Sequence, residues 1–460
     1  MDPSKRRVVI VGGGITGLAA AYFLTQKSVD VVVLEGRDRV GGNIRTEREG
    51  EFVLDCGPDS WVVTKPHASS LAKKLGLEGE LMPTIEATRR VYIAHDGKLH
   101  PLPEGLVLGV PTRMRPIVET SLFSVLGKAR MALEPLVKRR VSNSDESIAD
   151  FVSRRLGHEA ADRLAGPLLG GIFAGDAKEL SIRATFPQFV QMEQEYGSLV
   201  RGMRKSRKPP PAGQATPSAF VSLRPGMDTL VDALVKALPV EAVRTRSAVN
   251  KIDKVAGGYD VVLDDGQVVR ASSVILTAVA GSCVRAFAPQ LAECLDAIEY
   301  RSTALTFFAF RRSDVSHPLD AVGFLVPRGT GLHALAATWV SSKWESRAPP
   351  GHVLMRVFFG GASDPEVLQR DDADLASLAR EELSKLMGRL GTPLFSRVYR
   401  FAGASPQPRV GHLERMDKVR TLLEQHPDLH LAGNGYWGIG IPDCIKQAED
   451  AAARVMAALR

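Results

Sequence analysis

Residues near the N-terminus have the types and spacing that bind the phosphates and ribose of a dinucleotide. Gly12, Gly14 and Gly17 follow an apolar run, and Glu35 ends the next apolar run. The first glycine allows a tight turn, the second lets the backbone approach a pyrophosphate, and the third lets a helix pack closely on a strand. The positive end of that helix, expected over about residues 15–26, then faces the phosphates. The pattern predicts a dinucleotide site in which Glu35 binds ribose hydroxyls and repels the 2′-phosphate of NADP.

The segment after Glu35 indicates which dinucleotide is bound. Arg39, Gly41 and Gly42 place a cation and two glycines just past the ribose-binding acid, and residues 54–60 contain a second tight turn. These features resemble the FAD-binding segment of the amine oxidase and protoporphyrinogen oxidase superfamily, in which the Arg-x-Gly-Gly backbone lies along the FAD. The resemblance implies FAD as the cofactor. The alternative is that the two glycine-rich stretches are unrelated surface turns.

Residues 429–445 form a second strong pattern, an apolar strand followed by a glycine-rich turn and the start of a helix that continues to the C-terminus. A helix that begins near Pro442 would direct its amides and its positive end at a flavin ring. That end would stabilise the negative charge that develops at N1 and C2=O of reduced flavin. An ordinary strand–helix unit is the alternative, and the pairing with the N-terminal pattern argues against it.

Length and composition are those of a large enzyme. A chain of 460 residues usually forms two or three domains, and 44% hydrophobic residues can supply their cores. We expect no integral membrane segment, because no stretch has the roughly 18 uninterrupted apolar residues that a span requires. The net charge of +7 favours an anionic substrate or an anionic membrane surface as a partner. Nucleic acid is not an expected partner, because the basic residues are scattered and no nucleic-acid motif is present.

The N-terminus and the cysteines favour a reducing compartment. Residues 5–7 precede an apolar run, as in a signal peptide, but residues 12–14 interrupt that run and the nucleotide-binding unit continues to Glu35. None of the cysteines has metal-ligand spacing. We therefore expect a cytoplasmic protein with no metal and with four reduced thiols, those of Cys56, Cys283, Cys294 and Cys444.

Strand, helix and turn signals predict three domains, two of them assembled from separated pieces. Helical periodicity is expected over about residues 87–205, and the basic, proline-rich stretch 205–218 is expected to be an exposed loop. The expected fold class is α/β, similar to the p-hydroxybenzoate hydroxylase and monoamine oxidase fold: a Rossmann-like FAD-binding domain, a mixed α+β substrate-binding domain and a mainly helical domain. The expected boundaries are 1–65, 219–280 and 398–460 for the FAD-binding domain, 66–86 and 281–397 for the substrate-binding domain, and 87–218 for the helical domain.

Basic and apolar residues interleave over residues 112–141 of the expected helical domain. Lys128 and Arg139, for example, alternate with Leu126 and Leu136. This pattern predicts either an amphipathic surface that makes peripheral contact with a membrane or a solvated helical face.

Several motifs resemble the protoporphyrinogen and coproporphyrinogen III oxidase family over nearly the whole chain. The most discriminating is the Gly-Ile-Phe-Ala-Gly-Asp sequence within residues 170–176, because related amine oxidases share the FAD-binding ends but not this element. Residues 127–130 and 440–445 are most similar to the soluble oxidases of Gram-positive type. The remaining motifs are the glycine-rich stretch 12–17, the Gly-Pro-Asp-Ser turn at 57–60 and the Ala-Thr-Phe-Pro stretch at 184–187.

The resemblance implies an activity in haem biosynthesis, the six-electron oxidation of coproporphyrinogen III to coproporphyrin III with O₂ reduced to H₂O₂. Protoporphyrinogen IX oxidation is the closest alternative, and a flavin amine oxidase or a non-catalytic flavoprotein are the others. The implied partners are the porphyrinogen, O₂ and the haem-pathway enzymes that receive the product. The oligomeric state is left open.

The resemblance also implies site residues. Gly175 would bring its backbone close to the substrate bridge, and Leu335, Trp339 and Phe358 would form apolar walls. His412 is expected to be a hydrogen-bonded structural histidine rather than a base. The expected FAD contacts are Gly12, Gly13, Gly14, Ile15, Thr16, Gly17, Glu35, Gly36, Arg39, Gly41, Gly42, Asn43, Gly57, Pro58, Asp59, Ser60, Val249, Phe401, Ile439, Gly440 and Ile441.

Substrate propionates require cations, and here the sequence departs from the family pattern. Val91 stands where related plastid enzymes carry a propionate-pairing arginine. Lys65, Arg89 and Arg90 are the candidates to replace it, with solvated surface charges as the alternative. The departure favours the tetracarboxylate coproporphyrinogen over protoporphyrinogen.

Overall fold

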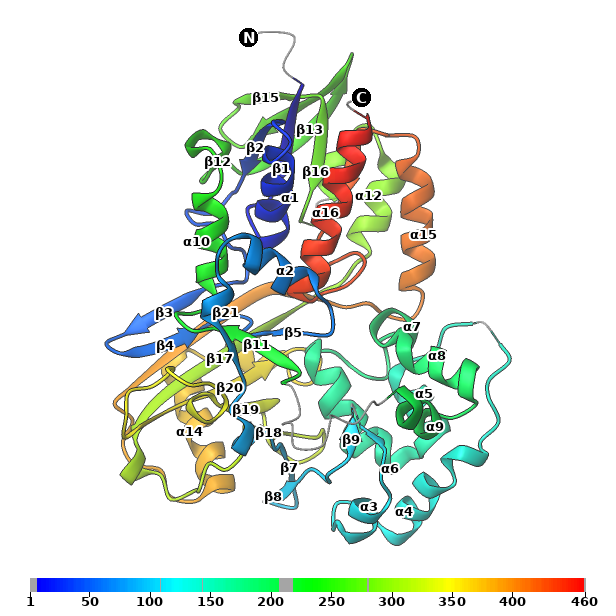
Figure 1. Cartoon of the computed structure of the whole chain (residues 1–460), viewed down its shortest axis with the longest axis vertical. Coiled ribbons are helices and arrows are strands. Elements are labelled where there is room, and N and C mark those ends of the chain that lie inside the picture. Colours follow the sequence, from blue (N-terminus) through cyan, green and yellow to red (C-terminus); the bar gives the residue numbers. More distant parts are fainter. Residues whose placement is uncertain (1–5, 108, 143, 207–217, 279–280, 459–460) are drawn as a thin grey trace.

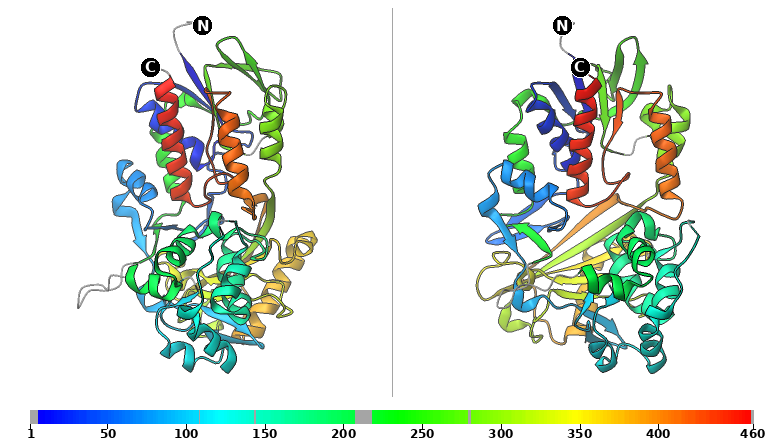
Figure 2. Two further views of the ribbon diagram at one scale, coloured as in Figure 1. Left: turned by 90° about the vertical axis from the view of Figure 1, so that its right-hand side faces the viewer. Right: turned by 45° about the vertical axis from the view of Figure 1, so that its right-hand side comes forward.

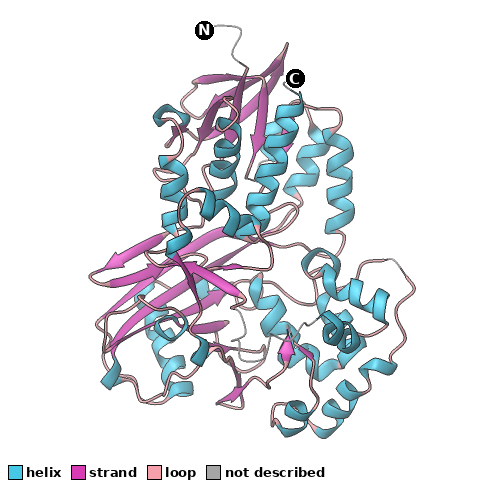
Figure 3. Ribbon diagram, viewed as in Figure 1, coloured by secondary structure: helices cyan, strands magenta, loops and turns pink. Residues whose placement is uncertain are grey.

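A computed structural model describes residues 6–107, 109–142, 144–206, 218–278 and 281–458. Most of the expected proline-rich loop, residues 207–217, lies outside the described residues. The two ends of the described chain lie at the same end of the molecule in all views (Figures 1 and 2). Strands are prominent at the end of the molecule near the termini and on one side of the opposite end. Helices dominate the other side of that opposite end, which we call the helical corner (Figure 3).

A parallel five-stranded sheet forms the part near the termini, in the order β12-β2-β1-β16-β22. Its central strands are almost entirely apolar and buried, as expected for a parallel sheet covered on both faces. Helices α1 (Ile15–Thr25) and α16 (Ile441–Ala458) pack side by side in one hydrophobic core on this sheet (Figure 1). The strands are β1 Arg7–Val11, β2 Asp30–Leu34, β12 Val243–Arg244, β16 Ser273–Leu276 and β22 Leu429–Leu431.

A seven-stranded mixed sheet lies in the half of the molecule away from the termini, in the order β21-β17-β20-β19-β18-β7-β8 (Figure 1). Helix α14 (Asp372–Met387) packs its buried residues against one face of it. The strands are β7 Tyr92–His95, β8 Lys98–Pro101, β17 Tyr300–Arg311, β18 Gly323–Leu325, β19 Ala336–Trp339, β20 His352–Gly360 and β21 Phe395–Pro406.

Strands β7 and β8 correct the expectation of helical periodicity from about residue 87, because they extend the seven-stranded sheet. Asp96 and Gly97 form the two-residue turn between them, with φ of +48° and +69°. An Asp-Gly pair between short apolar segments is a hairpin signal, and it outweighs helical spacing here. The α-helices of this region begin only at Arg115.

The helical corner surrounds its own hydrophobic core. The described residues contain no helix that is both long and apolar enough to cross a membrane. The principal helices of the helical corner are α3 Arg115–Glu119, α4 Val125–Ala132, α5 Ile148–Leu156, α8 Pro187–Tyr196 and α9 Leu199–Ser206. The shorter elements there are α6 His158–Ala160, α7 Ile182–Thr185 and a π-helix over Ala161–Gly170.

Smaller elements connect these parts. A three-stranded sheet in the order β5-β11-β6 lies where the two large sheets meet, and the sheet β13-β14-β15 covers the second face of the parallel sheet. The remaining strands and helices are β3 Thr46–Glu49, β4 Phe52–Asp55, β5 Trp61–Val62, β6 Leu81–Pro83, β9 Leu106–Val107, β10 Val110–Pro111, β11 Phe220–Leu223, β13 Val249–Val255, β14 Gly258–Leu263, β15 Val268–Ala271, α2 His67–Lys74, α10 Asp228–Lys236, α11 Gly281–Val284, α12 Pro289–Asp296, α13 Val340–Lys343 and α15 His412–Leu423.

Candidate active site

The glycines at the start of α1 form a cradle for a pyrophosphate. Gly12 has φ of +103°, and a Cβ there would lie 2.6 Å from Thr277 Oγ1. A Cβ on Gly17 would overlap the Gly12 carbonyl oxygen. Gly14 differs, because the nearest heavy atom to its Cβ would be Gly42 Cα at 3.9 Å. Among the described residues no side chain caps the N-terminus of α1, so the first amides of the helix, at Ile15 and Thr16, can face a phosphate.

Glu35 lies at the end of β2, directly beside the cradle. Its Oε2 accepts from the Gly13 amide at 2.8 Å and its Oε1 accepts from the Arg37 amide at 2.9 Å. The Glu35 carbonyl accepts from the Ser247 amide, which brings the start of β13 at Val249 to the same edge. A Cβ on Gly36 would lie 3.1 Å from Ala248 Cβ, so the glycine permits this approach. The two amides hold the carboxylate in one orientation beside the cradle.

Arg39 shapes the loop that follows. Its Nη2 donates to the Gly42 carbonyl at 2.8 Å and its Nη1 donates to the Val40 carbonyl at 3.1 Å. Gly41 and Gly42 have φ of +97° and +59°, and the Gly41 amide donates to the Gly13 carbonyl. The guanidinium therefore holds the two glycines against the cradle.

Asn43 connects this loop to β21 of the seven-stranded sheet, the strand that also carries Phe401. The Asn43 Nδ2 donates to the Ala404 carbonyl of β21 at 3.4 Å. Phe401 lies on the same strand, opposite Thr303 of β17, and is half-buried against the core that also contains Phe358.

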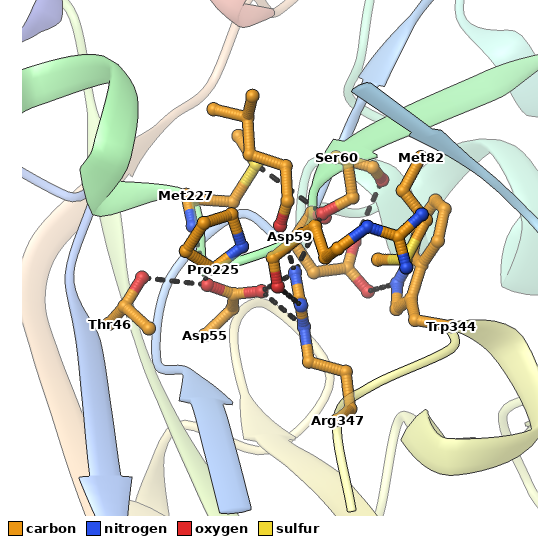
Figure 4. Close-up of polar contacts among 12 residues, drawn as sticks. Thr46, Asp55, Asp59, Ser60, Met82, Pro225, Met227, Trp344 and Arg347 are labelled. Carbon is orange, nitrogen blue, oxygen red and sulfur yellow. Dashed lines mark hydrogen bonds and ion pairs between the residues drawn. The ribbon is translucent and has the colours of Figure 1, made fainter. Parts of the chain in front are cut away.

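The 57–60 turn packs on this loop through Gly57, because a Cβ there would overlap the Asn43 carbonyl oxygen. Asp59 is buried and receives two cations, with Lys343 Nζ and Arg356 Nη2 each 2.8 Å from Oδ2. Trp344 Nε1 also donates to Oδ2 at 3.0 Å (Figure 4). Burial alone would raise the pKa of Asp59, but Arg356 and Lys343 outweigh it and hold the pKa well below its usual range. Asp59 is therefore a carboxylate at neutral pH.

A second buried ion pair supports the same turn. Arg347 Nη2 lies 2.9 Å from Asp55 Oδ2, and both side chains are buried (Figure 4). Arg356 Nη1 donates to the carbonyl oxygens of Asp55 and Gly57 at 3.0 and 3.2 Å. Sequence reasoning missed Lys343, Arg347 and Arg356, because nothing in their local spacing signals a carboxylate partner near residue 55.

The turn before α16 and the first turn of that helix face the same region. Asp443 lies in the first helical turn and pairs with Lys65, whose Nζ is 2.7 Å from both carboxylate oxygens. Ile439 and Gly440 precede the helix, and Ile441 begins it. Burial raises the pKa of the Cys444 thiol to about 12, so this thiol is neutral. The contacts of Gly41, Gly57 and Lys65 bring together the N-terminal ends of α1 and α16, residues 39–43 and the 57–60 turn, which are the segments that the sequence predicts as FAD contacts.

The 170–176 element is bonded to three segments that directly follow strands β18, β20 and β21 of the seven-stranded sheet. Ala174, with φ of +49°, accepts from the Ala362 amide at 2.8 Å. The Phe173 carbonyl accepts from Gln407 Nε2 at 2.9 Å. Arg328 Nη1 lies 2.7 Å from Asp176 Oδ2. The element is thus held in one conformation against the sheet, and Arg328 is a further contributor that sequence reasoning missed.

The packing around Gly175 gives a structural reason for a glycine at this position. The residue is buried, and a Cβ there would lie 2.5 Å from Gln407 Oε1 and 2.7 Å from Leu180 Cδ1. Close packing against these two side chains is therefore sufficient to require a glycine here. The expected backbone contact with the substrate stays a prediction.

The three expected apolar walls do not share one face of the sheet. Trp339 is fully buried, opposite Met355 in the core that contacts α14. Phe358 lies two positions beyond Arg356 on β20, on the other face, with the Arg356 guanidinium 4.8 Å from its ring centroid. The prediction of Trp339 as a pocket wall is wrong, because strand register turns it away from Phe358. Leu335 is half-buried and donates its amide to the Phe358 carbonyl.

The expected propionate cations lie apart from one another. Lys65 pairs with α16, as described above. Arg89 Nε donates to Thr84 Oγ1 at 2.9 Å. The neighbouring Ile85 amide donates to the Lys343 carbonyl. Arg90 is exposed and its carbonyl accepts from the Val322 amide.

His412 is a structural histidine. Its ring is buried, and Nε2 lies 2.8 Å from the Tyr436 carbonyl. Burial lowers the pKa of His412, which keeps the ring neutral. The hydrogen bond secures the start of α15 to the turn before α16.

Comparison with known proteins covers nearly the whole chain. A family model described as flavin containing amine oxidoreductase matches residues 15–456. The chain is 36% identical to the coproporphyrinogen III oxidase of Bacillus subtilis (strain 168), over 98% of both chains. It is 29% identical to protoporphyrinogen oxidase 1, chloroplastic, of Arabidopsis thaliana, over 97% of this chain and 87% of the relative.

Solved structures show the same fold. An Exiguobacterium sp. 255-15 protein assigned as a protoporphyrinogen oxidase superposes with a TM-score of 0.87 at 33% identity, over 99% of both chains. Reduced UDP-galactopyranose mutase superposes with a TM-score of 0.74 at 17% identity, over 98% of this chain and 96% of that one. The predicted fold class is confirmed.

Proposed function

The chain belongs to the flavin-containing amine oxidoreductase family, and on that premise we propose that it is an FAD-dependent oxidase that converts coproporphyrinogen III to coproporphyrin III. Family membership confirms the predicted flavin cofactor and the predicted oxidoreductase activity. The predicted relation to the porphyrinogen oxidases is confirmed by the full-length bacterial relatives.

The observation that supports this substrate best is the full-length similarity to bacterial proteins named coproporphyrinogen III oxidase. The fixed conformation of the 170–176 element is the second support. The relatives cover the helical corner as well as the FAD-binding ends. That element belongs to the region expected to receive the macrocycle, and its contacts with Ala362, Gln407 and Arg328 give it a defined shape. Protoporphyrinogen IX is the alternative substrate.

FAD would supply the redox chemistry, taking two electrons from the macrocycle in each of three rounds and passing them to three O₂ molecules to give three H₂O₂. The chain mainly binds and orients. The open amides of α1 would hold the pyrophosphate and Glu35 the ribose. Arg356 and Lys343 hold the 57–60 turn in place.

For the substrate, we assign Phe358 and Leu335 to the apolar wall and keep Arg89 and Arg90 as cations for propionates. We also retain a division into three domains, a cytoplasmic location, and transfer of the product to later haem-pathway enzymes. The expected boundaries change, because β7, β8 and β21 belong to the seven-stranded sheet and therefore to the substrate-binding domain. The remaining FAD contacts stay as expected from the resemblance.

Anaerobic mixing tests the reaction. The purified holoenzyme is mixed with coproporphyrinogen III or with a panel of primary amines and polyamines, and the visible absorbance of the flavin is followed. We expect bleaching by the porphyrinogen alone, and formation of porphyrin and H₂O₂ once O₂ is admitted. Bleaching by amines alone would identify an amine oxidase, and a flavin that no donor bleaches would identify a non-catalytic flavoprotein.

We further propose peripheral contact with an anionic membrane through the region around α4. Val125 and Leu126 are 81% and 82% exposed, and Lys128 and Arg139 lie in the same basic, apolar segment. Flotation with anionic vesicles tests this contact. Leu126→Gln should weaken flotation, whereas Val240→Ser, at an exposed valine of the parallel-sheet region, should not.

A further inference from the structure

Lys65 and Asp443 form an ion pair that joins the segment after the 57–60 turn to the first turn of α16. The Lys65 Nζ lies 2.7 Å from both carboxylate oxygens of Asp443. The two residues are far apart in the sequence, so the pair exists only because the fold places this segment against α16. The charge of Lys65 is therefore already directed at a carboxylate of the chain itself.

Asp443 is enclosed by the glycine-rich turn that precedes α16. A Cβ on Gly438 would lie 2.8 Å from the Asp443 Cβ, and a Cβ on Gly440 would lie 3.2 Å from Asp443 Oδ2. Gly438 has φ of +136°, which favours glycine. The turn thus wraps around a carboxylate at the end of the helix where the backbone amides carry positive partial charge.

A carboxylate at this position has two opposite effects. It stabilises the N-terminus of α16, as acidic residues in a first helical turn do. It also cancels part of the positive potential that this 18-residue helix presents to a neighbouring anionic group. A cation in contact with the carboxylate restores that potential, because the pair as a whole is neutral.

We propose that Lys65 is a positioning residue for the flavin: by neutralising Asp443, it keeps the positive end of α16 available to the reduced cofactor. This inference rests on the proposed flavin-dependent function and replaces the expectation that Lys65 binds a substrate propionate. A lysine that moved to a propionate would leave the Asp443 carboxylate unpaired beside the cofactor.

The same helix supplies a matched control. Lys446 pairs with Asp450 further along α16, and both Lys446 and Lys65 have side chains that are 52% exposed. Lys446→Met therefore removes a similar surface ion pair from the same helix, away from its N-terminal turn.

The experiment compares holoenzymes carrying Lys65→Met, Asp443→Asn, both substitutions together, and Lys446→Met. The reduction potential of the flavin is measured by anaerobic spectroscopic titration against a reference dye, and FAD content by absorbance. KM and flavin reduction are measured with coproporphyrinogen III. Lys65→Met should lower the potential and slow flavin reduction about threefold, the size of effect expected for one charge at a helix terminus. KM should not change, the double variant should return to wild-type values, and Lys446→Met should match wild type.

Two results would overturn the inference. One is an increase in KM of about tenfold in Lys65→Met with an unchanged potential, because about 1.4 kcal/mol of lost substrate binding would then identify a propionate contact. The other is a double variant whose potential stays as low as that of Lys65→Met. If Lys65→Met loses FAD, recovery of FAD content in the double variant supports the ion pair and its absence contradicts it.

Failure of the proposed function would look different. A wild-type holoenzyme that oxidises no porphyrinogen contradicts the function, while the reduction potentials of the four variants still test the ion pair.

Discussion

Arg356 and Asp59 form a buried ion pair in which Nη2 of the arginine lies 2.8 Å from Oδ2 of the aspartate. Arg356 comes from the middle of the seven-stranded sheet, and Asp59 belongs to the turn that we assign to FAD binding. The same guanidinium donates to the carbonyl oxygens of Asp55 and Gly57. A single side chain of the sheet therefore contacts Asp55, Gly57 and Asp59 together.

Arg356→Met should destabilise the apoprotein by about 3 kcal/mol, the lower end for breaking a buried ion pair, because Lys343 still neutralises Asp59. The midpoint of chemical denaturation measures this loss. Arg115→Met removes an exposed pair with Glu119 and should leave the midpoint unchanged. Equal midpoints for the two variants would show that the buried pair does not hold the fold together.

Gly14→Ala and Gly17→Ala should separate cofactor binding from folding. The new Cβ at Gly14 has no atom of the described chain closer than 3.9 Å, so the apoprotein should keep its stability. The Cβ would enter the space assigned to the pyrophosphate, and the Kd for FAD should rise at least about tenfold. Gly17→Ala should destabilise the apoprotein itself, because its Cβ overlaps the Gly12 carbonyl. Unchanged FAD affinity in Gly14→Ala, measured by fluorescence quenching, would contradict the assigned cradle.

Gly175→Ala should cost about 2 kcal/mol of stability through overpacking against Gln407 and Leu180. Gly171→Ala, in the same element, has no described heavy atom within 4 Å of the new Cβ and should be neutral. Thermal denaturation of the two apoproteins compares them. A stable Gly175→Ala protein with impaired turnover would contradict this packing account and support the expected backbone contact with the substrate.

His430 should make stability depend on pH. Burial lowers the pKa of His430 to about 4, below its ordinary value of about 6.5 in an unfolded chain. The unfolded state therefore binds the proton first, and the stability contributed by the neutral ring is lost as pH falls from about 6.5 towards about 4. When the pH is lowered from about 7 to about 5, the free energy of unfolding of wild type should fall by about 2 kcal/mol more than that of His430→Gln. Identical losses in urea titrations at the two pH values would be inconsistent with a buried neutral His430.

The local parts of the cofactor cradle could be predicted from the sequence. Glu35, the α1 glycines and the start of α16 are each defined by neighbouring residues, because a strand, a turn and a helix follow one another with fixed spacing.

The long-range partners could not be predicted. Lys343 and Arg356 meet Asp59 only after the sheet and the turn have folded together, and no local pattern marks that pairing. Trp339 failed as a prediction for a related reason. The family resemblance implied a pocket aromatic, but only strand register decides which face of the sheet a residue occupies.

Fluorescence detection of porphyrin formation, with coproporphyrinogen III and protoporphyrinogen IX compared under the same conditions, tests the proposed substrate most directly. We predict FAD-dependent oxidation with a higher kcat/KM for coproporphyrinogen III and with H₂O₂ formed in step with porphyrin. A preference of about tenfold or more for protoporphyrinogen IX, equivalent to about 1.4 kcal/mol in transition-state binding, would contradict the proposal.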